Sequence, residues 1–455
     1  MHSLDSMHSS QATAQPSAVR STLASTRPQI RCDLEAARER TSALLDPLPE
    51  AEWSRQHSPL MSPLIWDLGH IAHYEEQWLL RALGEHRLSP SQFDSIYDPV
   101  NPRAMRPNLP LLNPAEVIQY LNRVRASVIE KLSAVDLGPG NPLTANGLVY
   151  RMVIQHEHQH CETILATLQL METFCYRPPS RRAPQIHRPK QAEQYVGGGP
   201  FLMGSGGGPW AYDNERPMHP VMLPPFFIDR FPVTNGEYAA FIDDGGYSRA
   251  SLWTADGWKH RLREGLEHPQ FWRGGHGQWF RRRFGWVEPL PLDEPVQHVC
   301  WYEADAFARW AGKRLPTEAE WEKAARGNPG ECAFQFPWGS APISSALANV
   351  GQDAFGPLPV GSFPLSSSPV GCEQMLGDVW EWTASNFSPY PGYTAFPYPE
   401  YSEPFFNSQY TVLRGGSWAA DPCVVRTSFR NWDFPTRRQI FAGFRCARDA
   451  SAQTT

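Results

Sequence analysis

A basic, proline-rich stretch divides this chain into two parts of different character. It reads "YRPPSRRAPQIHRPKQ" and begins at Tyr176. Proline has no amide hydrogen and fixes its own φ angle, so such a stretch can neither continue a helix nor pair within a sheet. A chain of 455 residues is also too long for one core of ordinary size. We therefore predict a linker over 176–194 between two domains at 29–175 and 195–450.

The first part is predicted to be helical. Its segments "RCDLEAARERTSALLDPL", "SPLIWDLGHIAHYEEQWLLRAL", "NPAEVIQYLNRVRASVIEKLSAV" and "NGLVYRMVIQHEHQHCETILATLQLME" all space their apolar residues at helical intervals. Ser62 is a candidate N-cap with Pro63 at the first helical position. Four segments of this length predict a four-helix bundle. The Ser-, Ala- and Thr-rich residues 1–28 are predicted to be a disordered tail.

The second part is predicted to contain short strands and long loops. Glycine, proline and tryptophan become frequent, and turn signals such as "GGGP", "DDGGY" and "RGGHG" recur. One helix stands out in "PTEAEWEKAARG", where Thr317 and Glu320 have the spacing of a capping box and Gly327 ends the run. Together the two parts predict the α+β class.

Composition narrows the possible partners and location. The formal net charge of -6 argues against a nucleic-acid partner. No apolar run approaches the roughly 20 residues that a membrane span needs, and residues 1–30 lack the apolar centre of a secretory signal. The eight cysteines are scattered without a Cys-x-x-Cys pair, so neither a disulfide framework nor a thiolate zinc site is indicated. We expect a cytoplasmic protein; the sequence does not indicate its oligomeric state.

The segment "VIQHEHQHCETI" indicates a metal site. At about 100° per residue, His156 and His160 lie about 40° apart on one helical face, and their rings can converge on one ion. His158 points elsewhere. Glu162 falls about 240° from His156, which argues against it as a direct ligand.

A third ligand must come from another helix of the bundle. His70, within "WDLGHIAHYEEQW", is the best candidate, and His73 on nearly the same face is the alternative. Bundles build metal sites from side chains on facing helices. A single histidine in a helix is more often a hydrogen-bonded core or surface residue, so the pair four residues apart carries most of this hypothesis.

Several motifs of the second part resemble one family. "RFPVTNGEYAAFI", "KRLPTEAEWEKAARG", "FPWG", "GDVWEWT", "VLRGGSW" and "GFRCAR" resemble the formylglycine-generating-enzyme (sulfatase-modifying factor) domain, which has a C-type-lectin-like fold. The first part resembles a DinB-like four-helix bundle. With the His-x3-His-x-Glu pattern of the bundle, the combination resembles the sulfoxide synthases of ergothioneine biosynthesis.

That resemblance implies an iron-dependent oxygenase. Such enzymes use Fe(2+) and O2 to join a cysteine thiol to the imidazole C2 of hercynine, forming a carbon–sulfur bond and a sulfoxide. It implies that His70, His156 and His160 hold the iron. Three neutral imidazoles suit a redox-active iron and leave positions open.

The resemblance also implies substrate contacts. The family segment that faces the iron corresponds here to Asn431, Trp432, Asp433 and Arg437, which are therefore expected to contact substrate. Gln159 is at the position that hydrogen-bonds the imidazole of hercynine.

The resemblance further places a catalytic tyrosine in "NFSPYPGY". We favour Tyr390 over Tyr393. Arg103 and Arg106, in "NPRAMRPNLPLL", resemble the pair that binds the carboxylates of γ-glutamylcysteine, so we expect this dipeptide rather than cysteine as the thiol donor.

Three alternative functions fit this sequence less well. An ovothiol-type synthase would couple cysteine to another ring carbon of histidine, but such proteins usually carry a further methyltransferase domain. Formylglycine generation needs two cysteines five residues apart, and here Cys423 is followed at that distance by Ser428. A non-catalytic lectin-like binding module would not need the three histidines.

Overall fold

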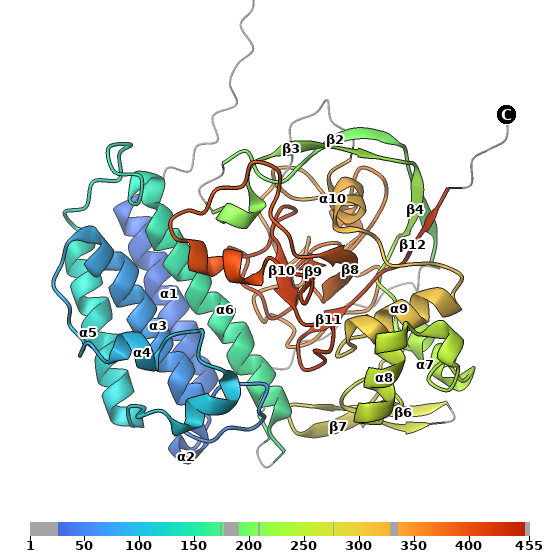
Figure 1. Ribbon diagram of the computed structural model, residues 1–455, viewed down its shortest axis with the longest axis horizontal. Coiled ribbons are helices and arrows are strands. Elements are labelled where there is room, and N and C mark those ends of the chain that lie inside the picture. Colours follow the sequence, from blue (N-terminus) through green and yellow to red (C-terminus); the bar gives the residue numbers. More distant parts are fainter. Residues whose placement is uncertain are drawn as a thin grey trace, which may run out of the picture.

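The structure is a computed structural model that describes residues 26–172, 175–176, 191–207, 210–275, 277–327 and 335–450. It has a helical domain and a mixed α/β domain side by side, as Figure 1 shows. The predicted α+β class with two domains is confirmed. Most of the predicted tail and most of the predicted linker lie outside the described residues. The first helix begins at Arg27 and the first strand at Glu193, each two residues before the predicted domain boundary.

The helical domain is a bundle of the four predicted helices with two short additional ones. Their bounds are α1 Arg27–Leu45, α2 Glu50–Trp53, α3 Leu64–Leu79, α4 Phe93–Ile96, α5 Pro114–Leu132 and α6 Leu148–Leu170. Asn113 and Glu116 form a capping box at the start of α5. The predicted start of α3 was one residue early: Pro63 has an extended backbone and is itself the N-cap, so Ser62 lies outside the helix.

A buried network of ion pairs joins the four long helices. Arg38 of α1 contacts Glu75 of α3 and Glu157 of α6 at 2.8 and 2.7 Å. Arg125 of α5 contacts the same two carboxylates at 2.5 and 2.8 Å. Each helix thus contributes one charge. Because an uncompensated buried charge is unfavourable, the network fixes the rotation of each helix about its axis.

In the residues that the structure describes, the second domain has four small sheets and four α-helices. The sheets are ordered β1-β4-β12, β10-β9-β8-β11, β2-β3 and β5-β6-β7. Their strands are β1 Glu193–Val196, β2 Gly199–Met203, β3 His219–Leu223, β4 Phe226–Asp229, β5 Trp272–Gly275, β6 Gln278–Arg283, β7 Trp286–Pro289, β8 Trp380–Asn386, β9 Thr411–Arg414, β10 Asn431–Asp433, β11 Ala442–Gly443 and β12 Ala447–Asp449.

The helices of this domain are α7 Asn235–Asp243, α8 Ala255–Glu264, α9 Trp301–Trp310 and α10 Glu318–Arg326. The helix predicted from "PTEAEWEKAARG" is confirmed as α10, with Thr317 and Glu320 in a capping box and Gly327 at the C-cap. The other three helices are short and were not predicted from the sequence.

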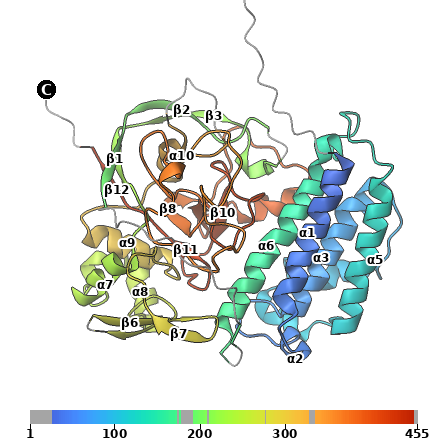
Figure 2. The ribbon, with the colours of Figure 1, turned by 180° about the vertical axis from the view of Figure 1, so that it is seen from behind.

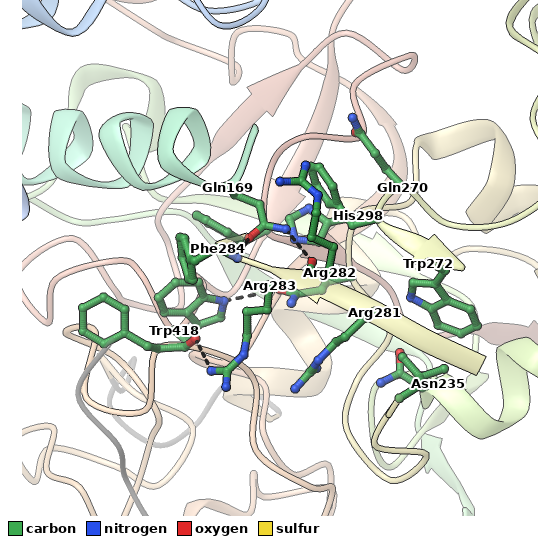
Figure 3. Close-up of a pocket in the computed structure, with 15 residues that line it drawn as sticks. Gln169, Asn235, Gln270, Trp272, Arg281, Arg282, Arg283, Phe284, His298 and Trp418 are labelled. Carbon is green, nitrogen blue, oxygen red and sulfur yellow. Dashed lines mark hydrogen bonds between the residues drawn. The ribbon is translucent and has the colours of Figure 1, made fainter. Parts of the chain in front are cut away.

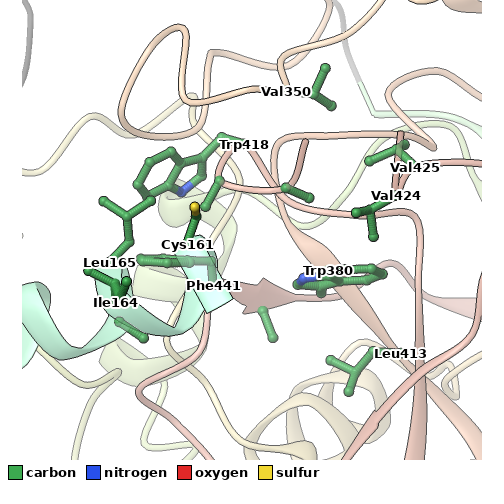
Figure 4. Packing of buried hydrophobic residues seen from close by; sticks show 14 of the residues in the cluster. Cys161, Ile164, Leu165, Val350, Trp380, Leu413, Trp418, Val424, Val425 and Phe441 are labelled. Atoms are coloured by element: carbon green, nitrogen blue, oxygen red, sulfur yellow. The ribbon is translucent and has the colours of Figure 1, made fainter. Parts of the chain in front are cut away.

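Helix α6 packs along the second domain, as both Figure 1 and Figure 2 show. Cys161, Ile164 and Leu165 are buried in the same apolar cluster as Trp418 and Phe441 of the second domain (Figure 4). One face of α6 therefore belongs to the bundle and another to the interface between the domains.

The end of α6 closes a small cavity against β6. Gln169 donates to the carbonyl of Arg282 at 2.8 Å and accepts from the amide of Phe284 at 2.8 Å (Figure 3). The cavity, which His298 and Trp418 also line, has a volume of about 20 Å³. That is room for roughly one water molecule, so it cannot hold a substrate. Within the described residues, no helix has both the length and the apolar character that a membrane crossing requires.

Candidate metal centre

The structure brings His70, His156 and His160 together in the bundle. One ring nitrogen of each lies within 4.8 Å of those of the other two. The Nε2 atoms of His70 and His156 are 3.1 Å apart. His70 and His156 are at most 9% exposed, whereas the side chain of His160 is 16% exposed. The predicted histidines thus form a cluster with one partly open side.

A backbone oxygen orients the ring of His70, and a carboxylate lies near the ring of His160. Nδ1 of His70 lies 2.7 Å from the carbonyl of Tyr97. Nδ1 of His160 lies 3.2 Å from Oδ1 of Asp67. A Cβ atom at Gly69 would overlap the ring of Tyr97, so glycine beside His70 allows this close approach. If each Nδ1 carries the hydrogen, each Nε2 presents a lone pair to the cluster.

These residues fit a divalent metal ion. Burial lowers the pKa of His70 and of His156 well below the ordinary value, and the charge that His160 can carry lowers both further. The two imidazoles are therefore neutral at pH 7, as ligation requires. Two lone pairs facing each other at 3.1 Å repel unless a cation or a shared proton lies between them. The donor set supports a metal with three nitrogen ligands and open positions.

His73 and Glu162 lie in the same helices as the three histidines but contact other groups. Nε2 of His73 lies 2.8 Å from Oδ1 of Asp94, away from the cluster. Oε1 of Glu162 accepts from Nε1 of Trp380 at 2.8 Å and from Oγ of Ser417 at 2.6 Å. Glu162 thus connects α6 to the "GDVWEWT" and "RGGSW" motifs of the second domain rather than to the histidines.

Phenols of both domains surround the cluster. The ring of Tyr74 stacks on His156 with centroids 3.8 Å apart, and its hydroxyl is 2.8 Å from that of Tyr398. Gln159 donates to the hydroxyl of Tyr401 and accepts from that of Tyr212, both at 3.4 Å. Tyr398 and Tyr401 were not predicted from the sequence. The segment "YPEY" offered a signal only through its place in the long loop after "GDVWEWT".

The predicted tyrosine lies elsewhere. Tyr390 packs with Phe201 and Met203, and its hydroxyl donates to Glu318 at 3.3 Å. The alternative, Tyr393, donates to Asp213 at 2.8 Å. Neither has a contact with the histidine cluster among the described residues. Tyr74 is the phenol that contacts the cluster, and Tyr398 is linked to it through its hydrogen bond to Tyr74.

Strand β10 connects the second domain to this group of phenols. Trp432 stacks on Phe387 at a centroid distance of 4.1 Å and meets Tyr401 edge-on at 5.7 Å. Asn431 precedes it on the same strand, and its Oδ1 accepts from the amide of Trp432. Contacts therefore run from Trp432 through Tyr401 to Gln159, next to His160.

Arg437 and Asp433 form a charged pair at the interface of the domains. Nε of Arg437 lies 3.2 Å from Oδ1 of Asp433, and its Nη1 donates to the carbonyl of Leu60 in the bundle at 3.1 Å. Burial lowers the pKa of Arg437; Asp433 opposes this shift, and the charge of Arg103 adds to it. Arg103, which is exposed, is thus close enough to act on the same group.

Arg106, which the sequence predicts to bind the thiol donor together with Arg103, makes its hydrogen bonds within the bundle, although the charge of Arg103 also acts on it. Its guanidinium lies 3.5 Å from the ring centre of Trp66, which in turn stacks on His70. Its nitrogens donate to Asn101, Ser62 and Pro99. Burial lowers the pKa of Arg106 to about 10. Arg106 therefore supports the ring behind His70.

Comparison with known proteins identifies the two domains and the family. The DinB superfamily model matches residues 33–164, and the sulfatase-modifying factor enzyme 1-like domain matches residues 180–450. The chain is 48% identical to the hercynine oxygenase of Mycobacterium tuberculosis over 92% of its own length and 99% of that protein. It is 49% identical to the hercynine oxygenase of Mycolicibacterium smegmatis, covering 92% and 98%. The chain belongs to the hercynine oxygenase family.

This hercynine oxygenase family member is therefore an enzyme, an oxygenase. Its second domain is also similar to a formylglycine-generating enzyme of Streptomyces coelicolor, with 34% identity over 56% of this chain and 88% of that protein. At the position where the second cysteine of that chemistry was expected, the hydroxyl of Ser428 donates to Glu215 at 2.7 Å. The family assignment follows the hercynine oxygenases, because they match both domains and the formylglycine-generating enzyme matches only the second.

Proposed function

We propose that this protein is an iron(II)- and O2-dependent sulfoxide synthase that joins the thiol of γ-glutamylcysteine to the imidazole C2 of hercynine. In the overall reaction the thiol S–H and the C2–H bonds break, and a C–S and an S=O bond form. One oxygen atom of O2 enters the sulfoxide, and the other leaves as water with the two hydrogens. The cluster of His70, His156 and His160 beside tyrosines of both domains is the observation that carries this proposal.

His70, His156 and His160 would hold the iron, which supplies O2 activation and binding of the thiol when it is present. The carbonyl of Tyr97 holds the ring of His70, and Asp67, 3.2 Å from Nδ1 of His160, would hold the second ring in the same way.

Hercynine would bind between α6 and β10. The hydrogen bonds of Gln159 to the two phenols are long, at 3.4 Å, so its amide can turn to the imidazole of the substrate. Trp432 and Asn431 on β10 would contact the trimethylammonium end and the carboxylate. An aromatic ring face attracts a quaternary ammonium group.

The thiol donor would lie beside Arg437, Asp433 and Arg103. Its two carboxylates need cations, and its ammonium group needs an acid. This assignment replaces Arg106 by Arg437 in the predicted arginine pair, because the guanidinium of Arg106 is bonded within the bundle.

Tyr398 would be the hydrogen donor near the reacting atoms. Burial raises the pKa of Tyr398, so the phenol keeps its proton at pH 7. Its hydrogen bond to Tyr74 fixes the position of its hydroxyl. A phenol held in this way can deliver a proton where O2 is reduced.

We further place the reaction in the cytoplasm, with small molecules as the only reactants. The described cysteines are free, as a reducing compartment would keep them.

The test is an incubation of the purified protein with iron(II), O2, hercynine and either thiol, read by mass spectrometry. We expect one product with the mass of both substrates joined and one oxygen atom added, and faster formation with γ-glutamylcysteine than with cysteine. Histidine in place of hercynine tests the ovothiol-type alternative, and NMR of the product identifies the substituted ring carbon. Absence of a C–S product with both thiols would contradict the proposal.

A further inference from the structure

The central histidine of "HEHQH" lies on the opposite side of α6 from the cluster described above. His158 faces the second domain, where Asp421 and Cys423 follow the "RGGSW" motif. One donor atom each of His158, Asp421 and Cys423 lies within 4.8 Å of the other two. The hercynine oxygenase chemistry proposed above uses none of these residues.

One polar atom of this group, Nδ1 of His158, is not satisfied among the described residues, whereas the thiol of Cys423 bonds to Asp421. His158 is 6% exposed, and its Nδ1 has no hydrogen-bond partner among the described residues. That atom is 3.6 Å from Oδ2 of Asp421, beyond a direct hydrogen bond. Oδ1 of Asp421 already accepts from the amide of Cys423 at 3.0 Å, which turns Oδ2 toward the histidine. A buried nitrogen that faces a carboxylate and a thiol without bonding to either indicates that something belongs between them.

We propose that His158, Asp421 and Cys423 bind a zinc ion at the interface of the two domains. An imidazole, a carboxylate and a thiolate are the three ligand types that zinc uses in proteins. Bonds of about 2.0–2.3 Å hold such ligands roughly 3.3–3.8 Å apart in a tetrahedron. His158 and Asp421 already fit this spacing at 3.6 Å, and the donor atom of Cys423 lies within 4.8 Å of both.

The surroundings allow the ion to enter. The side chain of Asp421 is 16% exposed and Cys423 is half-buried, so water can reach the site and supply a fourth ligand. The Sγ–H proton of Cys423 would leave to solvent when zinc binds. Arg40 of α1 lies 4.0 Å from Asp421 and opposes a cation, but its Nη1 donates to the carbonyl of Gly351. The thiolate and Asp421 carry enough negative charge to balance the zinc ion.

This site would fasten α6 to the second domain from the face opposite the three histidines. Cys-x-x-Cys spacing could not reveal it, because His158 and Cys423 are far apart in the sequence and meet only through the packing of the domains. Its ligand set differs from the three imidazoles, so the two sites select different metals.

Cobalt substitution tests the proposal directly. Metal-free protein is titrated with Co²⁺, because a thiolate ligand produces a charge-transfer absorption in the near ultraviolet. We expect the band in wild type and in His156→Ala, which removes binding at the other cluster. Cys423→Ser should lose the band and Asp421→Asn should weaken cobalt binding about tenfold or more. Cys32→Ser, which removes an exposed thiol of α1, is the matched control and should keep the band.

Zinc binding gives a second measurement. Elemental analysis should find about one zinc ion per chain in wild type, and added Zn²⁺ should raise the melting temperature of wild type but not of Cys423→Ser. Retained visible absorption from cobalt at the three histidines shows that Cys423→Ser has folded. A wild-type spectrum without the thiolate band, or a band that survives Cys423→Ser, would overturn the proposal. Loss of the band in Cys32→Ser would equally overturn it.

Discussion

The bundle and the second domain contribute to the candidate centre in different ways. In the bundle, His70, His156 and His160 stand on regular helices whose rotation is fixed by the buried ion pairs around Glu75 and Glu157. In the second domain, Tyr398 and Tyr401 stand in the long segment between β8 and β9, and Trp432 on a three-residue strand. The bundle thus fixes the metal ligands by helical geometry, and the second domain brings its groups through loops.

This difference predicts two classes of variant. Substitutions at the bundle histidines should act on metal content itself. Substitutions in the second domain should leave the metal in place and act on what the bound substrates do. A second-domain variant that loses iron, or a histidine variant that keeps it, would break the distinction.

The largest expected effect is at His70. His70→Ala should remove most of the iron and lower activity at least about a hundredfold, because two imidazoles on one helix make an incomplete site. Iron per chain is measured by elemental analysis. His73→Ala is the matched control on the same helix and should keep the iron, because its ring contacts Asp94 instead. The opposite pattern would show that His73 is the ligand.

Tyr398→Phe should redirect the reaction without removing the metal. The ring stays, but the hydroxyl that bonds to Tyr74 is gone, and we expect C–S product to fall about a hundredfold while thiol oxidation continues. Product ratios by mass spectrometry and iron content are measured together. Tyr390→Phe is the control, since its hydroxyl contacts Glu318. A changed product ratio in Tyr390→Phe alone would restore the tyrosine favoured from the sequence.

The sequence predicted the bundle part of the centre better than the loop part for a physical reason. Helical periodicity places His156 and His160 on one face whatever surrounds them, and the capping box of α10 is similarly local. The segment that carries Tyr390 and Tyr398 has no periodic pattern of apolar residues from which the direction of a side chain could be predicted. Which phenol reaches the cluster depends on Tyr74, a residue of the other domain.

The arginines illustrate the same limit. Arg103 and Arg106 share one short segment, and the sequence predicts a pair. The tertiary structure separates the roles of the two arginines. Arg106 packs on Trp66, whereas Arg437 of the second domain approaches Arg103. The ion pairs of Arg38 and Arg125 were not predicted either, because charged residues on helices are usually solvated.

Arg437→Ala should have a moderate effect on one substrate. Loss of one charge-assisted contact of about 1.5–3 kcal/mol should raise the Michaelis constant for γ-glutamylcysteine by roughly tenfold or more. The constant for hercynine should change much less. Arg106→Ala is the informative comparison, because it should lower stability or iron content through Trp66 and leave donor selectivity unchanged. If Arg106→Ala instead raised the Michaelis constant for γ-glutamylcysteine alone, Arg106 would belong to the binding site of the thiol donor.

The smallest expected effect belongs to a residue that both domains share. Glu162 is half-buried at the interface, desolvation raises its pKa, and its Oε1 accepts from Trp380 and Ser417 of the second domain. Glu162→Gln keeps an acceptor oxygen at this place and should change stability by less than about 1 kcal/mol, with iron content unchanged. Glu162→Ala leaves two buried donors without a partner, so it should lower the melting temperature, by the equivalent of about 1–3 kcal/mol for each donor. Thermal unfolding of the two variants measures this difference directly. Loss of iron in Glu162→Gln would instead indicate that Glu162 is a metal ligand. In that case the metal-binding face of α6 and its face toward the second domain would share this residue.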